Sequence, residues 1–201
     1  MDKEVYMFKK LLSILVLTTI SFFSNAYTIN YVGTIEAKKY NDVWEQYFDA
    51  DIIVYAGSNG QTSNIRLVFD MSFDKYNYDF VFNGVDPSVV SEYQTFIKHL
   101  TKASDWAKIA QDNNANTSKD IGSCNVKGTK CKVSFQSSNG GKNIVTKIWI
   151  KEDEDFTFNE DTFRLTPRQV NQLLKWFDDA SMAERLELSA MENNQSDELF
   201  N

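Results

Sequence analysis

The chain has 201 residues, with 21 basic and 28 acidic side chains and one histidine, so its formal net charge is −7. This acidic balance argues against nucleic acid as a partner, because affinity for phosphates comes largely from Lys and Arg. It argues equally against an anionic membrane surface.

The first 26 residues predict a cleavable signal peptide. Lys9 and Lys10 form a basic segment, and an apolar run follows from Leu11 to Phe23. Ser24 and Ala26 then provide the small residues that a signal peptidase requires. The apolar run is too short to span a bilayer of about 30 Å, so we expect no membrane insertion after cleavage.

Cleavage after Ala26 leaves a domain of 175 residues, with 18 basic and 26 acidic side chains and a net charge of −8. We expect one α+β domain over residues 27–183, with related halves at 27–113 and 120–183, and a frayed acidic tail at 184–201. The predicted location is periplasmic or secreted. An acidic surface suits a basic protein partner. Association of the chain with copies of itself is left open as an alternative.

Cys124 and Cys131 are the only cysteines. In an oxidising compartment an even count predicts a disulfide. A two-residue turn at Lys127-Gly128 places Cys124 directly opposite Cys131 in a hairpin. The short loop limits the stabilisation to about 2.5 kcal/mol.

A second hairpin is predicted at Asn59-Gly60, since both central residues of a type I′ turn need a positive φ. A two-residue turn there pairs Val54 with Ile65 and Ile52 with Leu67. One face of this ladder is then apolar and the other mixed, as in a half-buried antiparallel sheet.

Two helices are predicted by their starts and their apolar spacing. The first follows Asp86-Pro87 and carries an apolar stripe that Trp106 and Ile109 extend. The second follows Thr166-Pro167. Both stripes need a sheet face to cover them.

Landmarks of the two halves recur 80 residues apart. Asn59-Gly60 matches Asn139-Gly140, and Pro87 matches Pro167, these being the two prolines of the chain. The pattern predicts a strand-strand-strand-helix unit used twice, with one helix after each half and both helices on one sheet face. Shared element order without common ancestry is the open alternative.

Two other clusters are candidate sites. Glu152, Asp153, Glu154 and Asp155 form the densest acidic run, which suits a solvated binding surface or, as an alternative, a carboxylate pair of a hydrolase. A second run places oxygen-bearing side chains at alternate positions, as in a calcium loop, although Thr117 and Ser123 depart from that pattern. Its members are Asp112, Asn114, Asn116, Ser118 and Asp120.

The single histidine, His99, lies beside an apolar stripe, and no nucleophile motif accompanies it. We therefore expect no catalytic residue, no metal ligand among the histidines and no cofactor. Tyr55 and Trp149 lie on a sheet face that is more apolar than a solvated face should be, which predicts a binding surface.

The sequence thus favours an exported, non-enzymatic protein that acts by binding another protein, such as an inhibitor or an immunity factor. Two alternatives stay open: an envelope-associated structural or assembly protein, and a carboxylate-dependent hydrolase.

Overall fold

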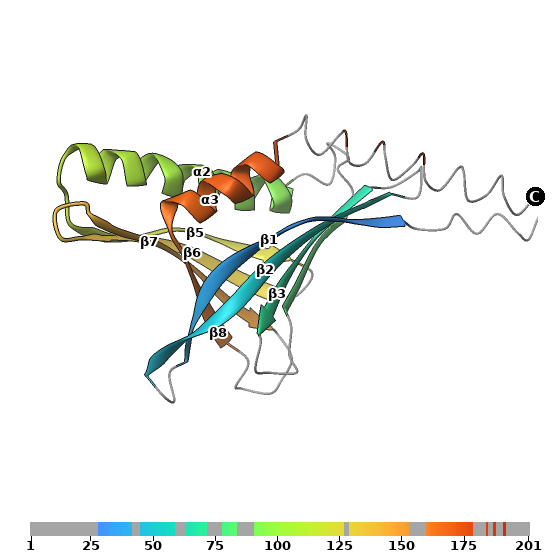
Figure 1. Ribbon diagram of the computed structural model, residues 1–201, viewed down its shortest axis with the longest axis horizontal. Coiled ribbons are helices and arrows are strands. Elements are labelled where there is room, and N and C mark those ends of the chain that lie inside the picture. Colours follow the sequence, from blue (N-terminus) through green and yellow to red (C-terminus); the bar gives the residue numbers. More distant parts are fainter. Residues whose placement is uncertain are drawn as a thin grey trace, which may run out of the picture.

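The structure is a computed structural model (Figure 1). It describes residues 28–41, 45–58, 63–71, 78–83, 91–126, 129–152 and 160–178, with Glu184, Glu187 and Met191. The predicted signal peptide, the turns at 59–60 and 127–128 and the acidic residues 153–155 lie outside this description. None of the described helices is long and apolar enough to cross a membrane.

Eight antiparallel strands of the described chain form one sheet in the order β4-β3-β2-β1-β8-β7-β6-β5. The strands are β1 (Thr28–Asn41), β2 (Gln46–Ser58), β3 (Ser63–Met71), β4 (Tyr78–Asn83), β5 (Thr117–Val126), β6 (Thr129–Ser138), β7 (Asn143–Glu152) and β8 (Glu160–Leu165), and the helices are α2 (Ser91–Asp112) and α3 (Pro167–Trp176). The α+β class is confirmed. The unit of three strands and a helix is not confirmed in that form, because four strands precede each helix.

The register of the β2–β3 hairpin differs from the predicted one by two residues. Val54 lies opposite Leu67, not Ile65, and Ile52 lies opposite Phe69, not Leu67. Ser58 pairs with Ser63, so four residues connect the strands where a two-residue turn was expected. Because side chains alternate with a period of two, this shift leaves every side chain on its predicted face.

Both helices cover the same face of the sheet, which we call the inner face (Figure 1). Helix α2 lies over β5 and β6, and α3 lies over β7, β8 and β1. Inner-face side chains of both halves join helix residues in one buried cluster. Its strand members include Ile35, Ile52, Leu67, Phe69, Val133, Ile148 and Phe163.

Helix α3 begins as its sequence predicts. Thr166 is the N-cap, Pro167 follows it, and Thr166 and Gln169 form a reciprocal capping box. Such a cap satisfies backbone N–H groups that have no partner inside the helix. Val170 and Leu173 then turn inward and are fully buried.

In helix α2 the buried stripe departs from the predicted one after Leu100. Ala103, Ala107 and Ala110 face the sheet and are buried, whereas Ile109 is 55% exposed. The extension of the stripe to Ile109 is therefore wrong. Small side chains let the end of α2 approach β6 closely, and larger apolar residues at these positions would hold it away.

Each helix packs over a glycine in the first strand of the other half. A Cβ atom on Gly33 of β1 would lie 2.3 Å from the Trp176 ring, and one on Gly122 of β5 would lie 2.2 Å from the His99 ring. Both glycines directly follow a break in strand register, after Tyr31 in β1 and after Asp120 in β5. The two helix contacts are thus built alike.

Candidate functional site

The face of the sheet turned away from the helices, which we call the outer face, carries a row of aromatic side chains. Trp149 of β7 lies opposite Thr162 of β8, which lies opposite Tyr40 of β1, and Tyr40 lies opposite Tyr47 of β2. The ring centroids of Tyr40 and Tyr47 are 4.9 Å apart. Tyr47 is 45% exposed, so the row offers aromatic surface to solvent.

The next row on the outer face is charged. Lys147 of β7 lies opposite Arg164 of β8, Arg164 lies opposite Lys38 of β1, and Lys38 lies opposite Asp49 of β2. Lys38 forms an ion pair with Asp49. Three cations therefore occupy adjacent positions on three neighbouring strands.

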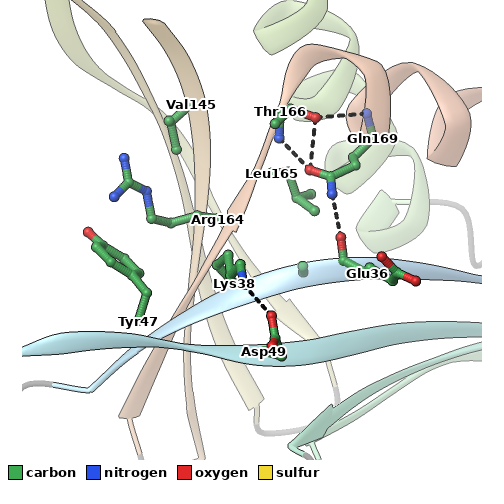
Figure 2. Close-up of a pocket in the computed structure, with 10 residues that line it drawn as sticks. Glu36, Lys38, Tyr47, Asp49, Val145, Arg164, Leu165, Thr166 and Gln169 are labelled. Carbon is green, nitrogen blue, oxygen red and sulfur yellow. Dashed lines mark hydrogen bonds and ion pairs between the residues drawn. The ribbon is translucent and has the colours of Figure 1, made fainter.

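A pocket of about 500 Å³ opens beside this charged row, where β1 leaves β8 (Figure 2). It spans five elements and combines charged, aromatic and aliphatic side chains. The lining residues are Glu36, Ala37, Lys38, Tyr47, Asp49, Val145, Arg164, Leu165, Thr166 and Gln169. This volume is within the range of about 300–1,000 Å³ that is common for ligand pockets.

Two contacts fix the walls of the pocket. The guanidinium carbon of Arg164 lies 4.5 Å from the centre of the Tyr47 ring, as a cation–π pair. On the other side, the amide nitrogen of Gln169 donates a hydrogen bond to the carbonyl oxygen of Glu36 (Figure 2). Gln169 thus joins the first turn of α3 to β1, while its carbonyl end completes the helix cap.

Charge on the outer face is divided between the two halves of the sheet. Carboxylates predominate on β1 to β3, with Glu36, Asp49, Asp51 and Asp70. Cations predominate on β6 to β8, with Lys130, Lys132, Lys147, Lys151 and Arg164. The pocket lies at the boundary between the two regions.

The pKa of Asp51, in the acidic region, is shifted by its surroundings. Partial burial raises the pKa of Asp51 above its usual range, and the neighbouring carboxylates of Asp70, Glu36 and Asp49 raise it further. Like charges disfavour the ionised form of one another, so a cation placed here would lower this pKa.

The predicted binding residues are not gathered at one point. Trp149 lies one row from the pocket, whereas Tyr55 is eight residues along β2 from Tyr47, where its ring contacts Tyr31. Glu152 ends β7, and Asp153, Glu154 and Asp155 lie outside the described residues. These acidic positions remain predictions.

Sequence reasoning missed the cationic part of the site. Lys38, Lys147 and Arg164 meet because β1 pairs with β8, and these strands are more than 100 residues apart in the chain. No local pattern marks this pairing. One local signal was available for Lys147. It is two residues from Trp149 along β7, so the two side chains had to share one face of the sheet.

The predicted calcium loop is spread over three local structures. Asp112 ends α2, Asn114 adopts a positive φ in the following turn, and Ser118 and Asp120 belong to β5. Asn116 accepts a hydrogen bond from the backbone of Gly140, and Asp120 pairs with Lys132. In the described part of the chain, no group of three or more His, Cys, Asp or Glu residues could hold a metal ion.

The disulfide is confirmed. Cys124 and Cys131 are bonded and directly opposite each other, with Cα atoms 4.9 Å apart. The flanking pairs, Asn125 with Lys130 and Val126 with Thr129, also match the predicted register. The bond joins β5, at the sheet edge, to β6.

His99 has a packing role in the structure. Its ring covers Gly122, and its Nε2 lies 3.1 Å from the carbonyl oxygen of Ser123, which accepts a hydrogen bond. The contact ties the middle of α2 to the edge strand β5.

Two carboxylates, Glu36 and Asp49, line the pocket, which is the arrangement a carboxylate-dependent hydrolase would require. The side chain of Asp49 is 78% exposed and pairs with Lys38. It therefore lacks the burial on which a general acid of this type depends.

No protein-family model, curated protein or solved structure matches this chain. The functional argument therefore rests on the geometry of its own residues.

Proposed function

We propose that the protein acts by binding another protein through the outer face of β1, β2, β7 and β8. The observation that carries this proposal is the aromatic row of Trp149, Tyr40 and Tyr47 beside an open pocket. Tyr and Trp contribute strongly to interfaces because they offer large contact areas with a polar end. Arg164 lies on the same surface, and arginine is the charged residue type most enriched at binding hot spots.

The proposed setting is outside the cytoplasm, with the signal peptide removed after Ala26. The disulfide between Cys124 and Cys131 supports this setting, because such bonds persist mainly in oxidising compartments. In that compartment the protein would act by occupancy, as an inhibitor or an immunity factor does. N-terminal sequencing of the exported protein should begin at Tyr27.

The test begins by capturing partners of the exported chain from the cells that produce it and identifying them by mass spectrometry. The affinity of a purified partner is then measured for Tyr47→Ala and, as a matched control, for Ile109→Ala. Both residues are exposed large side chains, but Ile109 lies on α2, on the opposite side of the sheet.

We expect Tyr47→Ala to weaken binding at least tenfold, which is the effect of losing about 1.4 kcal/mol at an interface. Ile109→Ala should leave the affinity unchanged. A partner whose affinity depends on Ile109 and not on Tyr47 would contradict the proposal.

We also infer that the two halves are copies of one unit of four strands and a helix. The glycine after each register break starts an equivalent row: Gly33 pairs with Val54, then Leu67, whereas Gly122 pairs with Val133, then Ile148. Sequences of homologues should align the halves at Gly33 and Gly122. An alignment that favours any other pairing would leave only a shared topology.

A further inference from the structure

Three cations lie side by side on the outer face, and one of them has a carboxylate partner in the described part of the chain. Lys147, Arg164 and Lys38 are direct cross-strand neighbours. Like charges in such positions destabilise a sheet. Within the described residues, Lys38 pairs with Asp49, but neither Lys147 nor Arg164 contacts a carboxylate. An anion bound beside Lys147 and Arg164 would reduce this repulsion.

The guanidinium of Arg164 is held in a position from which it could bind such an anion. The group lies over the Tyr47 ring, which restricts the side chain, and a guanidinium carries five N–H donors in its plane. Arginine binds carboxylates through two parallel hydrogen bonds, and restricting it in advance reduces the entropy lost on binding. In Figure 2 the Arg164 side chain lies between Tyr47 and Val145, at the pocket wall.

The charged residues that line the pocket balance one another, because Lys38 and Arg164 are matched by Glu36 and Asp49. Lys147 lies outside the lining, directly opposite Arg164 on β7, and adds one positive charge at this edge of the pocket. A ligand that reaches Arg164 from this edge is therefore favoured if it carries one negative charge. A phosphate with a charge near −2 would bring a larger charge towards Glu36 and Asp49.

Apolar and polar residues complete the lining. Val145 contributes aliphatic surface beside the Tyr47 ring, Ala37 and Leu165 are buried aliphatic members, and Thr166 and Gln169 are held by the helix cap. A ligand that fills the pocket therefore combines one carboxylate with adjacent apolar groups. We propose that this pocket binds an acidic side chain of the partner protein, flanked by apolar residues. The inference rests on the proposed function and adds the chemical class of the segment that is recognised.

The negative net charge of the chain, −7, does not oppose this inference at short range. Charges separated by more than about 8 Å are largely screened at physiological ionic strength. The cations of β6 to β8 are the nearest charges on one side of the pocket, and they attract a carboxylate. The acidic net charge affects the rate of encounter more than the bound state.

The experiment uses two blocked peptides, acetyl-Leu-Glu-Leu-amide and acetyl-Leu-Gln-Leu-amide, with the full exported chain. Binding is followed by NMR, through the side-chain Nε–H signal of Arg164 and the backbone amides of Ala37 and Leu165. Arg164→Gln tests the proposed contact. Lys108→Gln, on the exposed surface of α2, makes the same change in net charge away from the pocket.

We expect the Glu peptide to shift all three signals and to bind at least tenfold more tightly than the Gln peptide. Arg164→Gln should remove this preference, whereas Lys108→Gln should retain it. Equal binding of the two peptides, shifts located elsewhere, or displacement of the Glu peptide by inorganic phosphate would overturn the inference.

Failure of this inference and failure of the proposed function give different results. If the affinity of the partner depends on Tyr47 but is unchanged in Arg164→Gln, the outer face is the binding surface and the inference about the acidic side chain is wrong. If no outer-face variant changes partner affinity, the proposed function itself is wrong, whatever the peptides show.

Discussion

The two halves of the sheet agree on the inner face and differ on the outer face. On the inner face each half presents aliphatic and aromatic residues, and each receives a helix over a glycine, Gly33 or Gly122. On the outer face the first half is acidic and the second half basic. The comparison indicates that packing constrains the side chains of the inner face, whereas the charges of the outer face can differ between the halves.

The largest expected change in the free energy of unfolding follows a substitution on the inner face, where the halves meet. The rings of Phe69 and Phe163 lie 4.9 Å apart, one from each half, and both are fully buried. Phe69→Ala should lower the free energy of unfolding by about 4 kcal/mol, through lost burial and the cavity left behind. Ile53→Ala, on the outer face of β2, should cost about 1 kcal/mol, because this side chain is only partly buried and its removal leaves little cavity. Urea titrations measure both, and equal losses would contradict the division into two faces.

The disulfide distinguishes the second half from the first. Cys124→Ser with Cys131→Ser should lower the free energy of unfolding by about 2.5 kcal/mol, because the unfolded chain is no longer cross-linked. Denaturation of the wild type with and without reductant should show the same difference. The double variant should not respond to reductant, and a response there would mean that the loss has another cause.

The two helix contacts should differ in their tolerance to a methyl group. Both rings are partly buried, but Trp176 is a large ring packed against the core and His99 is a smaller one. Gly33→Ala should therefore cost about 2 kcal/mol and Gly122→Ala about 1 kcal/mol, the usual range for overpacking. Adding Trp176→Leu to Gly33→Ala should cost less than the sum of the two single changes. Strict additivity would show that the ring and the glycine are not coupled.

The smallest expected change in the free energy of unfolding concerns the acidic part of the outer face, on β1 to β3. Because the folded-state pKa of Asp51 is raised above its unfolded value, ionisation of this group opposes folding. The penalty is complete above the folded-state pKa and is relieved as the pH falls through it. Asp51→Asn should thus raise the free energy of unfolding at pH 7 by about 0.5 kcal/mol, a value limited by solvent screening.

The same measurement at acidic pH supplies the control for Asp51. The gain should vanish as the pH falls below both pKa values, because the carboxyl is then protonated in both states. Asp105→Asn, an exposed acid on α2, makes the same charge change outside the cluster. A lower stability of Asp51→Asn at pH 7 would contradict the repulsion described for the acidic region.

Local structure could be predicted from the sequence wherever neighbouring residues determine it. Thr166-Pro167 starts a helix because its cap is complete within four residues, and Cys124 faces Cys131 because a short turn separates them. The β2–β3 hairpin was predicted on the correct faces but in the wrong register. The alternation of side chains determines the face, whereas the length of the turn determines the register.

The candidate site could not be predicted because it depends on a long-range pairing. Lys38 and Arg164 are cross-strand neighbours through the pairing of the first and last strands of the sheet. No turn or motif connects those strands, so their charges could not be placed together in advance. Trp149 was predicted on a sheet face that is more apolar than a solvated face should be, and it does lie on the outer face next to the charged row.

The central claim is that the outer face of β1, β2, β7 and β8 contacts the partner, and photo-crosslinking tests it most directly. A benzoylphenylalanine at position 47 or at position 109 places the same reactive group on opposite sides of the sheet, at positions that are both well exposed. Irradiation of the producing cells should give one discrete crosslinked protein from position 47 and none from position 109. A discrete product from position 109 together with none from position 47 would contradict the claim.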